Sequence, residues 1–108
     1  MHLIRIQQLE EIVRKKPQDL FAIFALAKEY EKIDKIKNAI ELIENLLVID
    51  LNYLGAYYFL GKLYEKNEQI NKALNIYEAG ILIAQKQKNL HTLSELRNAK
   101  LNLEFEDI

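Results

Sequence analysis

The sequence predicts an all-α fold: an α-solenoid of antiparallel helix pairs, about six helices in a single domain over residues 1–108. Half of the residues are hydrophobic, yet there are only one Pro and three Gly, fewer than hairpins, barrels or glycine-rich phosphate loops need. Apolar residues recur at i, i+3, i+4 and i+7, the stripe of an amphipathic helix. One segment also recurs at a fixed offset, which is the sign of a repeat architecture.

The recurring segment is LAKEYEK at 26–32, which returns as LGKLYEK at 60–66, 34 positions later and with five of the seven residues identical. The same offset relates other positions in both units: Leu20 to Leu54, Ile23 to Tyr57, Ile36 to Ile70, Ala39 to Ala73 and Ile43 to Tyr77. One register therefore holds over two whole units, one at 18–50 and the next at 51–87.

This period and pattern resemble the tetratricopeptide repeat, a helix–turn–helix unit of 34 residues. The positions that carry the resemblance are Ile23, Leu26, Ala27, Tyr30, Ala39 and Ile43 in the first unit and Tyr57, Leu60, Gly61, Tyr64, Ala73 and Tyr77 in the second. The family's usual Trp is absent from both units, and its closing Pro is replaced by Leu51 and Gln85. The resemblance covers about residues 20–87.

Small residues mark the places where paired helices should approach closely. We expect Ala27 to lie against Ala39, and Gly61 to lie against Ala73 and Gly80, because a larger side chain there would force the helices apart. Large buried rings, Tyr30 and Tyr64, should fill the space beside these contacts.

The N-terminal segment, residues 1–16, is predicted to be a half-repeat: one helix over about 2–15 that corresponds to the second helix of a unit. Its apolar stripe is Leu3, Ile6, Leu9, Ile12 and Val13. Pro17 should close it and then occupy the first turn of the next helix, where its missing N–H does no harm. Asp19 follows and complements the positive end of that helix.

In the two full units we predict a helix to about Lys32, a turn at Asp34 and helices over about 35–49, 51–66 and 69–87. Asp50 is a good N-cap for the helix over 51–66. Asn67 suits a left-handed residue at its C-terminal end.

The last segment, residues 90–106, is predicted to be a C-terminal capping helix, because the end of a repeat stack must be covered. Continuing the 34-residue register places polar residues at the former core positions: His91, Ser94, Glu95 and Asn98. Thr92 and Glu95 have the spacing of a capping box, so we expect the helix to begin at Thr92. Alternatively, the helix over 69–87 runs on and merges with it.

Composition argues against catalysis, and we expect no enzyme activity, no catalytic residues and no cofactor. The chain has no Cys, and His2 and His91 lie far apart in sequence. His91 and Glu95 are spaced as two ligands could be, but two ligands do not make a metal site. No nucleophile elbow, phosphate loop or dinucleotide fingerprint is present.

Charge and hydropathy exclude two classes of partner. Fifteen basic residues balance sixteen acidic ones, whereas a nucleic-acid protein needs a basic patch. The longest apolar runs are far below the ~20 residues that span a bilayer, and no segment reads as a signal peptide. We therefore expect no nucleic acid, no membrane and a cytoplasmic location.

The resemblance implies that the first helix of each unit lines a concave groove where peptides bind. It maps Phe21, Phe24, Lys28, Glu31 and Lys32 of the first unit and Gly55, Tyr58, Lys62, Glu65 and Lys66 of the second onto that groove. An aromatic followed one turn later by a Lys occurs in both. Such a groove suits a protein or peptide with an apolar anchor and an acidic group. The alternative is that these residues only pack at the surface.

Chaperone-binding members of the family hold a C-terminal carboxylate in a clamp of Lys, Asn and Arg. Here Lys28 and Lys62 stand where that clamp carries Asn, and Phe24 stands where it carries Lys. The sequence therefore does not predict chaperone tails as partners.

A second functional hypothesis is structural self-association into a homodimer without a peptide ligand. The N-terminal helix carries an apolar edge, Leu3, Ile6 and Val13, which could pair with a second copy, since isologous dimers are the commonest assembly.

Overall fold

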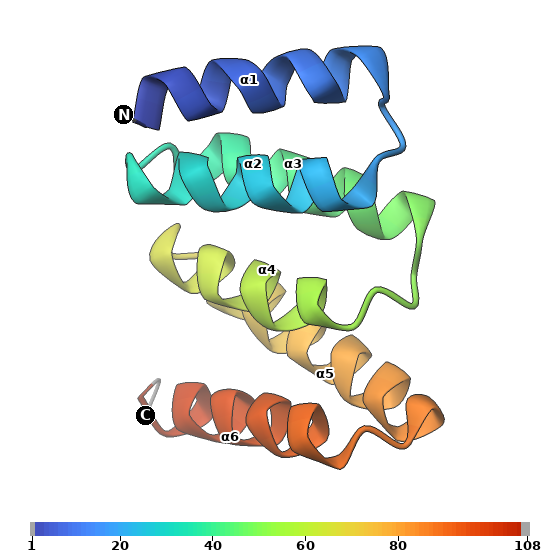
Figure 1. Ribbon diagram of the computed structural model, residues 1–108. Helices are drawn as coiled ribbons and strands as arrows, with labels where there is room; N and C mark the ends of the chain where they lie inside the picture. The colour runs from blue at the N-terminus through green and yellow to red at the C-terminus, as the bar shows by residue number, and fades with distance from the viewer. Residues whose placement is uncertain (1, 107–108) are drawn as a thin grey trace. The chain divides into compact units, whose positions relative to one another are not determined.

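The computed structural model describes residues 2–106, and this range folds into six α-helices with no strand (Figure 1). They are α1 (His2–Lys15), α2 (Leu20–Lys32), α3 (Ile36–Ile49), α4 (Gly55–Lys66), α5 (Ile70–Gln87) and α6 (Leu90–Glu106). The all-α fold predicted from the sequence is confirmed. The chain forms two compact units, one ending at Leu51 and one beginning at Asn52.

The first unit contains α1, α2 and α3. Figure 1 shows α1 and α2 antiparallel and side by side, with α3 behind α2. Ile6 and Leu9 of α1 meet Leu26 of α2 in a buried cluster, and Leu42 of α3 packs against the same cluster. Since all three helices contribute to one core, α1 is held on the first unit by apolar burial.

The second unit contains α4, α5 and α6, and α5 lies against both of the others. Helices α4 and α6 both come close to α5 at Gly80. A Cβ there would lie 2.6 Å from the Cβ of Tyr57 on α4 and 3.1 Å from the Cδ1 of Leu96 on α6. Glycine at this position therefore lets two helices reach α5 at the same level.

Three helices end through the same turn geometry. Asp34, Glu68 and Lys88 have φ of 62°, 59° and 57°, the left-handed conformation that commonly closes a helix. After each of them, the next N–H donates to a carbonyl five residues back in the helix, at 2.8–3.0 Å. The left-handed residue predicted at Asn67 is wrong, because Asn67 has a φ of −89° and Glu68 makes the turn.

The starts of α2 and α4 differ from the sequence prediction. Asp19 is the N-cap of α2, and its carboxylate accepts from the N–H of Ala22 at 3.1 Å. Pro17 therefore lies in the turn before α2 and not in its first turn. Asp50 is the C-cap of α3 and does not cap α4, which begins only at Gly55. Residues 51–54 form a turn between the end of α3 and the start of α4, so Asp50 lies too far from α4 to cap it.

The last helix keeps the repeat pattern after an insertion of two residues. Asn89 caps α6 as Asp19 caps α2, its side chain accepting from the N–H of Thr92 at 3.1 Å. The buried residues Leu93 and Leu96 follow this cap at the same distances as Ile23 and Leu26 follow Asp19.

The capping box predicted at Thr92 is therefore wrong, since α6 starts at Leu90. The cause lies in α5, which has 18 residues where α3 has 14, so a strict 34-residue register misplaces every later position. The left-handed Lys88 separates α5 from α6, and the two helices do not merge.

The small residues behave as expected in position but not in every contact. Ala27 and Ala39 are wholly buried. A Cβ at Gly61 would meet the ring of Tyr77, at 2.1 Å from Cε1, and neither Ala73 nor Gly80 is among its nearest neighbours.

The two tyrosines at the repeated register position are not equally buried. Tyr64 is 6% exposed, while Tyr30 is half-buried and its hydroxyl donates to Glu10 of α1. The expectation of two equivalent buried rings therefore holds only for Tyr64.

Candidate functional site

In the first unit, α2 carries an aromatic ring with an ammonium group over it. Phe24 and Lys28 are one helical turn apart, so their side chains meet on the same face. The Nζ of Lys28 lies 5.0 Å from the centroid of the Phe24 ring, within the range of a cation–π interaction. Phe24 is half-buried and Lys28 is exposed, which leaves the cation accessible above an apolar platform.

In the second unit, α4 repeats this arrangement with Tyr58 and Lys62. The Nζ of Lys62 lies 5.5 Å from the centroid of the Tyr58 ring. The ring also contacts Tyr77 of α5, with centroids 6.4 Å apart and planes tilted by 46°. Lys62 additionally lies 3.6 Å from a carboxylate oxygen of Glu65. Packing against α5 thus fixes the aromatic half of the pair, while the lysine keeps 40% of its side chain exposed.

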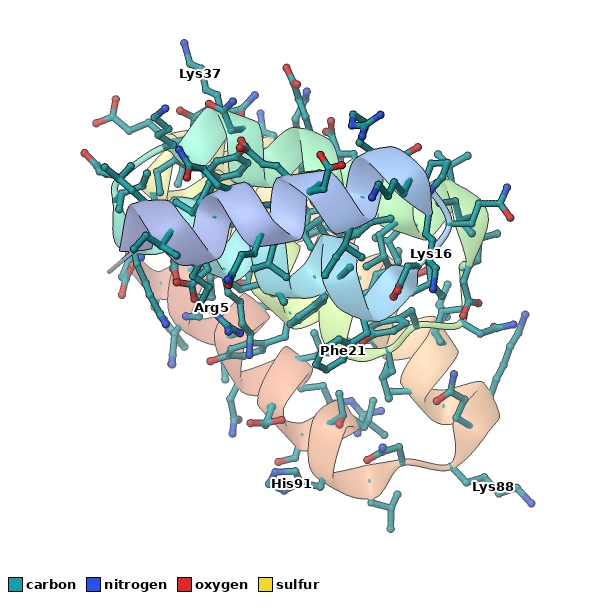
Figure 2. The ribbon with its side chains drawn as sticks, turned by 45° about the horizontal axis from the view of Figure 1, so that its top comes forward. Arg5, Lys16, Phe21, Lys37, Lys88 and His91 are labelled. Carbon is teal, nitrogen blue, oxygen red and sulfur yellow. The ribbon has the colours of Figure 1, made fainter. Side chains whose placement is uncertain are left out.

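The remaining predicted groove residues are less alike between the units. Phe21 projects from the first turn of α2 and is 77% exposed (Figure 2), but its counterpart on α4 is Gly55. Lys32 lies 3.0 Å from Glu29, and Lys66 is exposed at the end of α4. Only the aromatic–lysine pair recurs with the same geometry.

A buried carboxylate in the first unit was not anticipated. Glu29 is 4% exposed and lies 3.0 Å from Lys32 and 3.6 Å from Arg5 of α1. Its counterpart in the second unit is Leu63, which is wholly buried. A charge is tolerated in that position because two cations offset its loss of hydration. An acidic residue in a leucine slot of the repeat is the signal that could have located it.

Two tyrosine hydroxyls tie neighbouring helices together and are not free for chemistry. Tyr30 donates to Glu10 of α1, and Tyr77 donates to Glu65 of α4. Burial and the adjacent Glu10 carboxylate raise the pKa of Tyr30 to about 12. Burial, with Glu65 beside it, raises the pKa of Tyr77 well above its ordinary value. Both phenols therefore remain protonated hydrogen-bond donors at neutral pH.

Within residues 2–106, no three His, Cys, Asp or Glu side chains gather as a metal ion requires. His91 and Glu95 lie 3.7 Å apart on α6, and the His91 side chain extends outward from the helix (Figure 2). Over the same range, every helix is too short or too polar to cross a bilayer.

Most of the apolar edge predicted for self-association is buried against α2 within the first unit. Ile6 is 5% exposed and Val13 packs against the cluster that joins α1 to α2. Of the three residues only Leu3 remains exposed, and Ile4 lies beside it, 62% exposed.

Comparison with solved structures gives close matches. A tetratricopeptide repeat domain protein from Salinibacter ruber, solved in solution, is 42% identical, covers 82% of this chain and 89% of its own, and superposes with a TM-score of 0.77. Its crystal structure, also 42% identical, matches 80% of this chain and 97% of its own with a TM-score of 0.74. No protein family model matches the chain, and neither does any curated protein.

More distant structures share the fold. The TPR2B domain of yeast Sti1, solved in complex with an Hsp70 peptide, is 16% identical and has a TM-score of 0.85 over 94% of this chain and 81% of its own. A Bordetella parapertussis protein is 24% identical and has a TM-score of 0.82, covering 94% of this chain and 89% of its own.

Proposed function

This chain belongs to the tetratricopeptide repeat family, and from that premise we propose that it is a non-catalytic module that binds a peptide or partner protein through α2 and α4. These are the helices that the family resemblance assigns to the concave groove. The structure of the Sti1 domain with an Hsp70 peptide supports a peptide partner for this fold in general. Chaperone tails are not the expected ligand, since the residues of the carboxylate clamp are not reproduced.

The observation that carries this proposal is the recurrence of one side-chain pair in both units. Lys28 lies over Phe24 and Lys62 lies over Tyr58, at 5.0 and 5.5 Å. Solubility alone requires only polar residues on the surface, and it does not require an aromatic ring and a cation at the same register in both repeats.

The pair also suggests the chemistry of the ligand. The ring supplies an apolar contact, and the ammonium above it supplies a charge-assisted hydrogen bond to a carboxylate. Because each lysine already rests on a ring, less side-chain entropy is lost when it binds. The partner segment should therefore present an acidic group next to an apolar side chain, as the sequence suggests.

The test is to capture partners from the native host and then titrate a confirmed one against variants. Lys28→Glu with Lys62→Glu should weaken binding at least tenfold, because each change replaces an attraction with a repulsion. Lys37→Glu with Lys86→Glu is the matched control, since both residues are exposed on α3 and α5 and the change in net charge is identical. Equal loss in both variants, or no loss in the first, would reject the groove.

Self-association through α1 is the second candidate function, and the exposure of Leu3 and Ile4 favours it. Light scattering at micromolar concentration should then show a dimer that Leu3→Lys with Ile4→Lys converts to a monomer. A monomeric unaltered chain would exclude it.

A further inference from the structure

The two aromatic–lysine pairs share one geometry but differ in the charge beside them. In the second unit, the Nζ of Lys62 lies 3.6 Å from the Oε2 atom of Glu65, which follows it by three residues on α4. The same oxygen accepts a hydrogen bond from the hydroxyl of Tyr77 on α5. A carboxylate is therefore held beside the ammonium group that rests on the Tyr58 ring.

Tyr77 fixes the position of this carboxylate. The ring of Tyr77 is wholly buried, and its centroid lies 6.4 Å from that of Tyr58. Burial and the neighbouring Glu65 raise the pKa of Tyr77, so its hydroxyl remains a donor at neutral pH. The side chain of Glu65 is only 22% exposed, and it cannot turn away from Lys62 without losing this hydrogen bond.

The first unit has no equivalent of this tyrosine. In the 34-residue register, Glu31 stands where Glu65 stands, and Ile43 stands where Tyr77 stands. Ile43 is wholly buried, and its side chain has no polar atom. This position of α3 therefore supplies no hydroxyl that could hold a carboxylate beside Lys28.

Lys28 accordingly presents its charge without an opposing one. It is exposed, and among the described residues 2–106 it lies over the ring of Phe24 and forms no ion pair. A ligand carboxylate that approaches the ring of the first unit meets a cation alone. In the second unit it meets a cation and an anion together, so the attraction is largely cancelled.

We propose that the first unit binds the acidic group of the partner segment and that the second unit binds an uncharged apolar side chain of the same segment. This inference rests on the proposed function, because it assigns the two groups of that ligand to the two units. A segment with its acidic group at one end is then bound in one direction only. Glu65 sets this direction by repelling the acidic end from the second unit, and Tyr77 positions Glu65.

The test compares two probes that share a ring and a linker and differ in one charge, phenylpropionate and phenylpropanol. Each is titrated into the isotope-labelled full chain, and the shifts of the backbone amides around Phe24 and around Tyr58 give a separate dissociation constant for each unit. In the first unit phenylpropionate should bind at least about threefold tighter than phenylpropanol, which is the effect of one exposed ion pair. In the second unit the two constants should agree.

Glu65→Gln is the decisive variant, because it removes the charge and keeps an oxygen that accepts from Tyr77. It should give the second unit the preference for phenylpropionate that the first unit has. Tyr77→Phe lets Glu65 turn toward solvent and should shift the second unit in the same direction by less. Glu31→Gln is the matched control, since it removes the same charge at the corresponding position of α2 and should leave the second unit unchanged. Circular dichroism establishes that each variant is folded.

An equal preference in both units of the unaltered chain overturns the inference and leaves the proposed function standing, and so does a second unit that gains no preference in Glu65→Gln. If neither probe gives a saturable shift around either ring, the proposed function fails and the inference fails with it. A confirmed partner supplies an independent check. Lys28→Glu alone should account for most of the loss expected of the double variant, and an equal loss from Lys62→Glu alone overturns the inference.

Discussion

At the scale of single residues, the two units solve the same packing problem with matched pairs. The first unit sets Ala27 and Ile43 at the positions where the second sets Gly61 and Tyr77. The larger ring of Tyr77 needs the space that a missing Cβ leaves at Gly61. The hydroxyl of Tyr77 then reaches Glu65. The identities at the two positions are therefore coupled, and neither is set by helix propensity alone.

Gly61→Ala should lower the free energy of unfolding by about 1–3 kcal/mol, the usual range for an overpacked core. Its Cβ would overlap the ring of Tyr77, which cannot move away because it is wholly buried. Adding Tyr77→Ile converts the pair to that of the first unit and should recover part of the loss. Urea unfolding monitored by circular dichroism measures both effects.

Gly55→Ala is the control for this prediction, since a Cβ at Gly55 has nothing within 4 Å. It should leave stability unchanged or raise it, by at most about 1 kcal/mol, because alanine is the better helix former. A loss at Gly55 as large as that at Gly61 would show that the ring of Tyr77 is not the cause.

At the scale of elements, the turns show a geometry that is set by the backbone and not by the residue. Asp34 and Glu68 are 34 positions apart and both adopt the left-handed conformation, although neither is the glycine or asparagine that favours it. The chain must reverse direction within a few residues between the two antiparallel helices. The packing of those helices therefore holds Asp34 and Glu68 in the left-handed conformation despite its conformational strain.

Asp34→Gly and Glu68→Gly should each raise the free energy of unfolding by about 0.5–1 kcal/mol. The left-handed conformation costs an ordinary residue roughly 1–2 kcal/mol, and glycine avoids this at a smaller cost in backbone entropy. Lys35→Gly tests the cause, because Lys35 has a φ of −92° and should lose stability instead. Thermal unfolding of the three variants gives the comparison, and a gain at Lys35 would contradict it.

The elements also show how far the sequence predicts this fold. The helices and the first-unit register follow from apolar spacing and from the 34-residue offset, and the structure confirms them. The start of α6 could not be predicted that way, because the added length of α5 is indistinguishable in sequence from a continued helix. The equal spacing of Asn89 and Asp19 from their buried leucines and isoleucines was the available clue, but it requires that the insertion be considered.

The candidate site was predictable to a similar extent. The i, i+4 spacing of Phe24 with Lys28 and of Tyr58 with Lys62 places each pair on one face, but only the structure puts each ammonium over its own ring. The burial of Glu29 depends on its ion pair with Arg5 of α1. Contacts between different helices cannot be predicted from the sequence of one helix alone.

At the scale of the whole molecule, the tyrosine–glutamate hydrogen bonds should make the free energy of unfolding fall as the pH rises into the alkaline range. In the unfolded chain a tyrosine loses its proton near pH 10, while burial and Glu10 hold the pKa of Tyr30 at about 12 in the folded protein. Ionisation therefore occurs first in the unfolded state. The contribution of Tyr30 is complete below pH 10 and is lost as the pH rises from 10 to 12.

The free energy of unfolding should accordingly fall less steeply between pH 10 and 12 in Tyr30→Phe than in the unaltered chain. The same holds for Tyr77→Phe, since burial and Glu65 raise that pKa as well. Between pH 7 and 9 both variants should show the slope of the unaltered chain. Urea titrations at fixed pH measure the slopes, and identical slopes above pH 10 would show that these phenols do not govern alkaline unfolding.

The contact between Gly61 and Tyr77 also makes the exchange of helices between the two units one-directional. A chimera with α4 in front of α3 sets Gly61 against Ile43 and leaves only unfilled volume, which a core partly absorbs. A chimera with α2 packed against α5 instead places the methyl of Ala27 where it overlaps the ring of Tyr77, and that ring cannot move because it is wholly buried. Although the two units share one 34-residue register, α4 can therefore replace α2 more readily than α2 can replace α4.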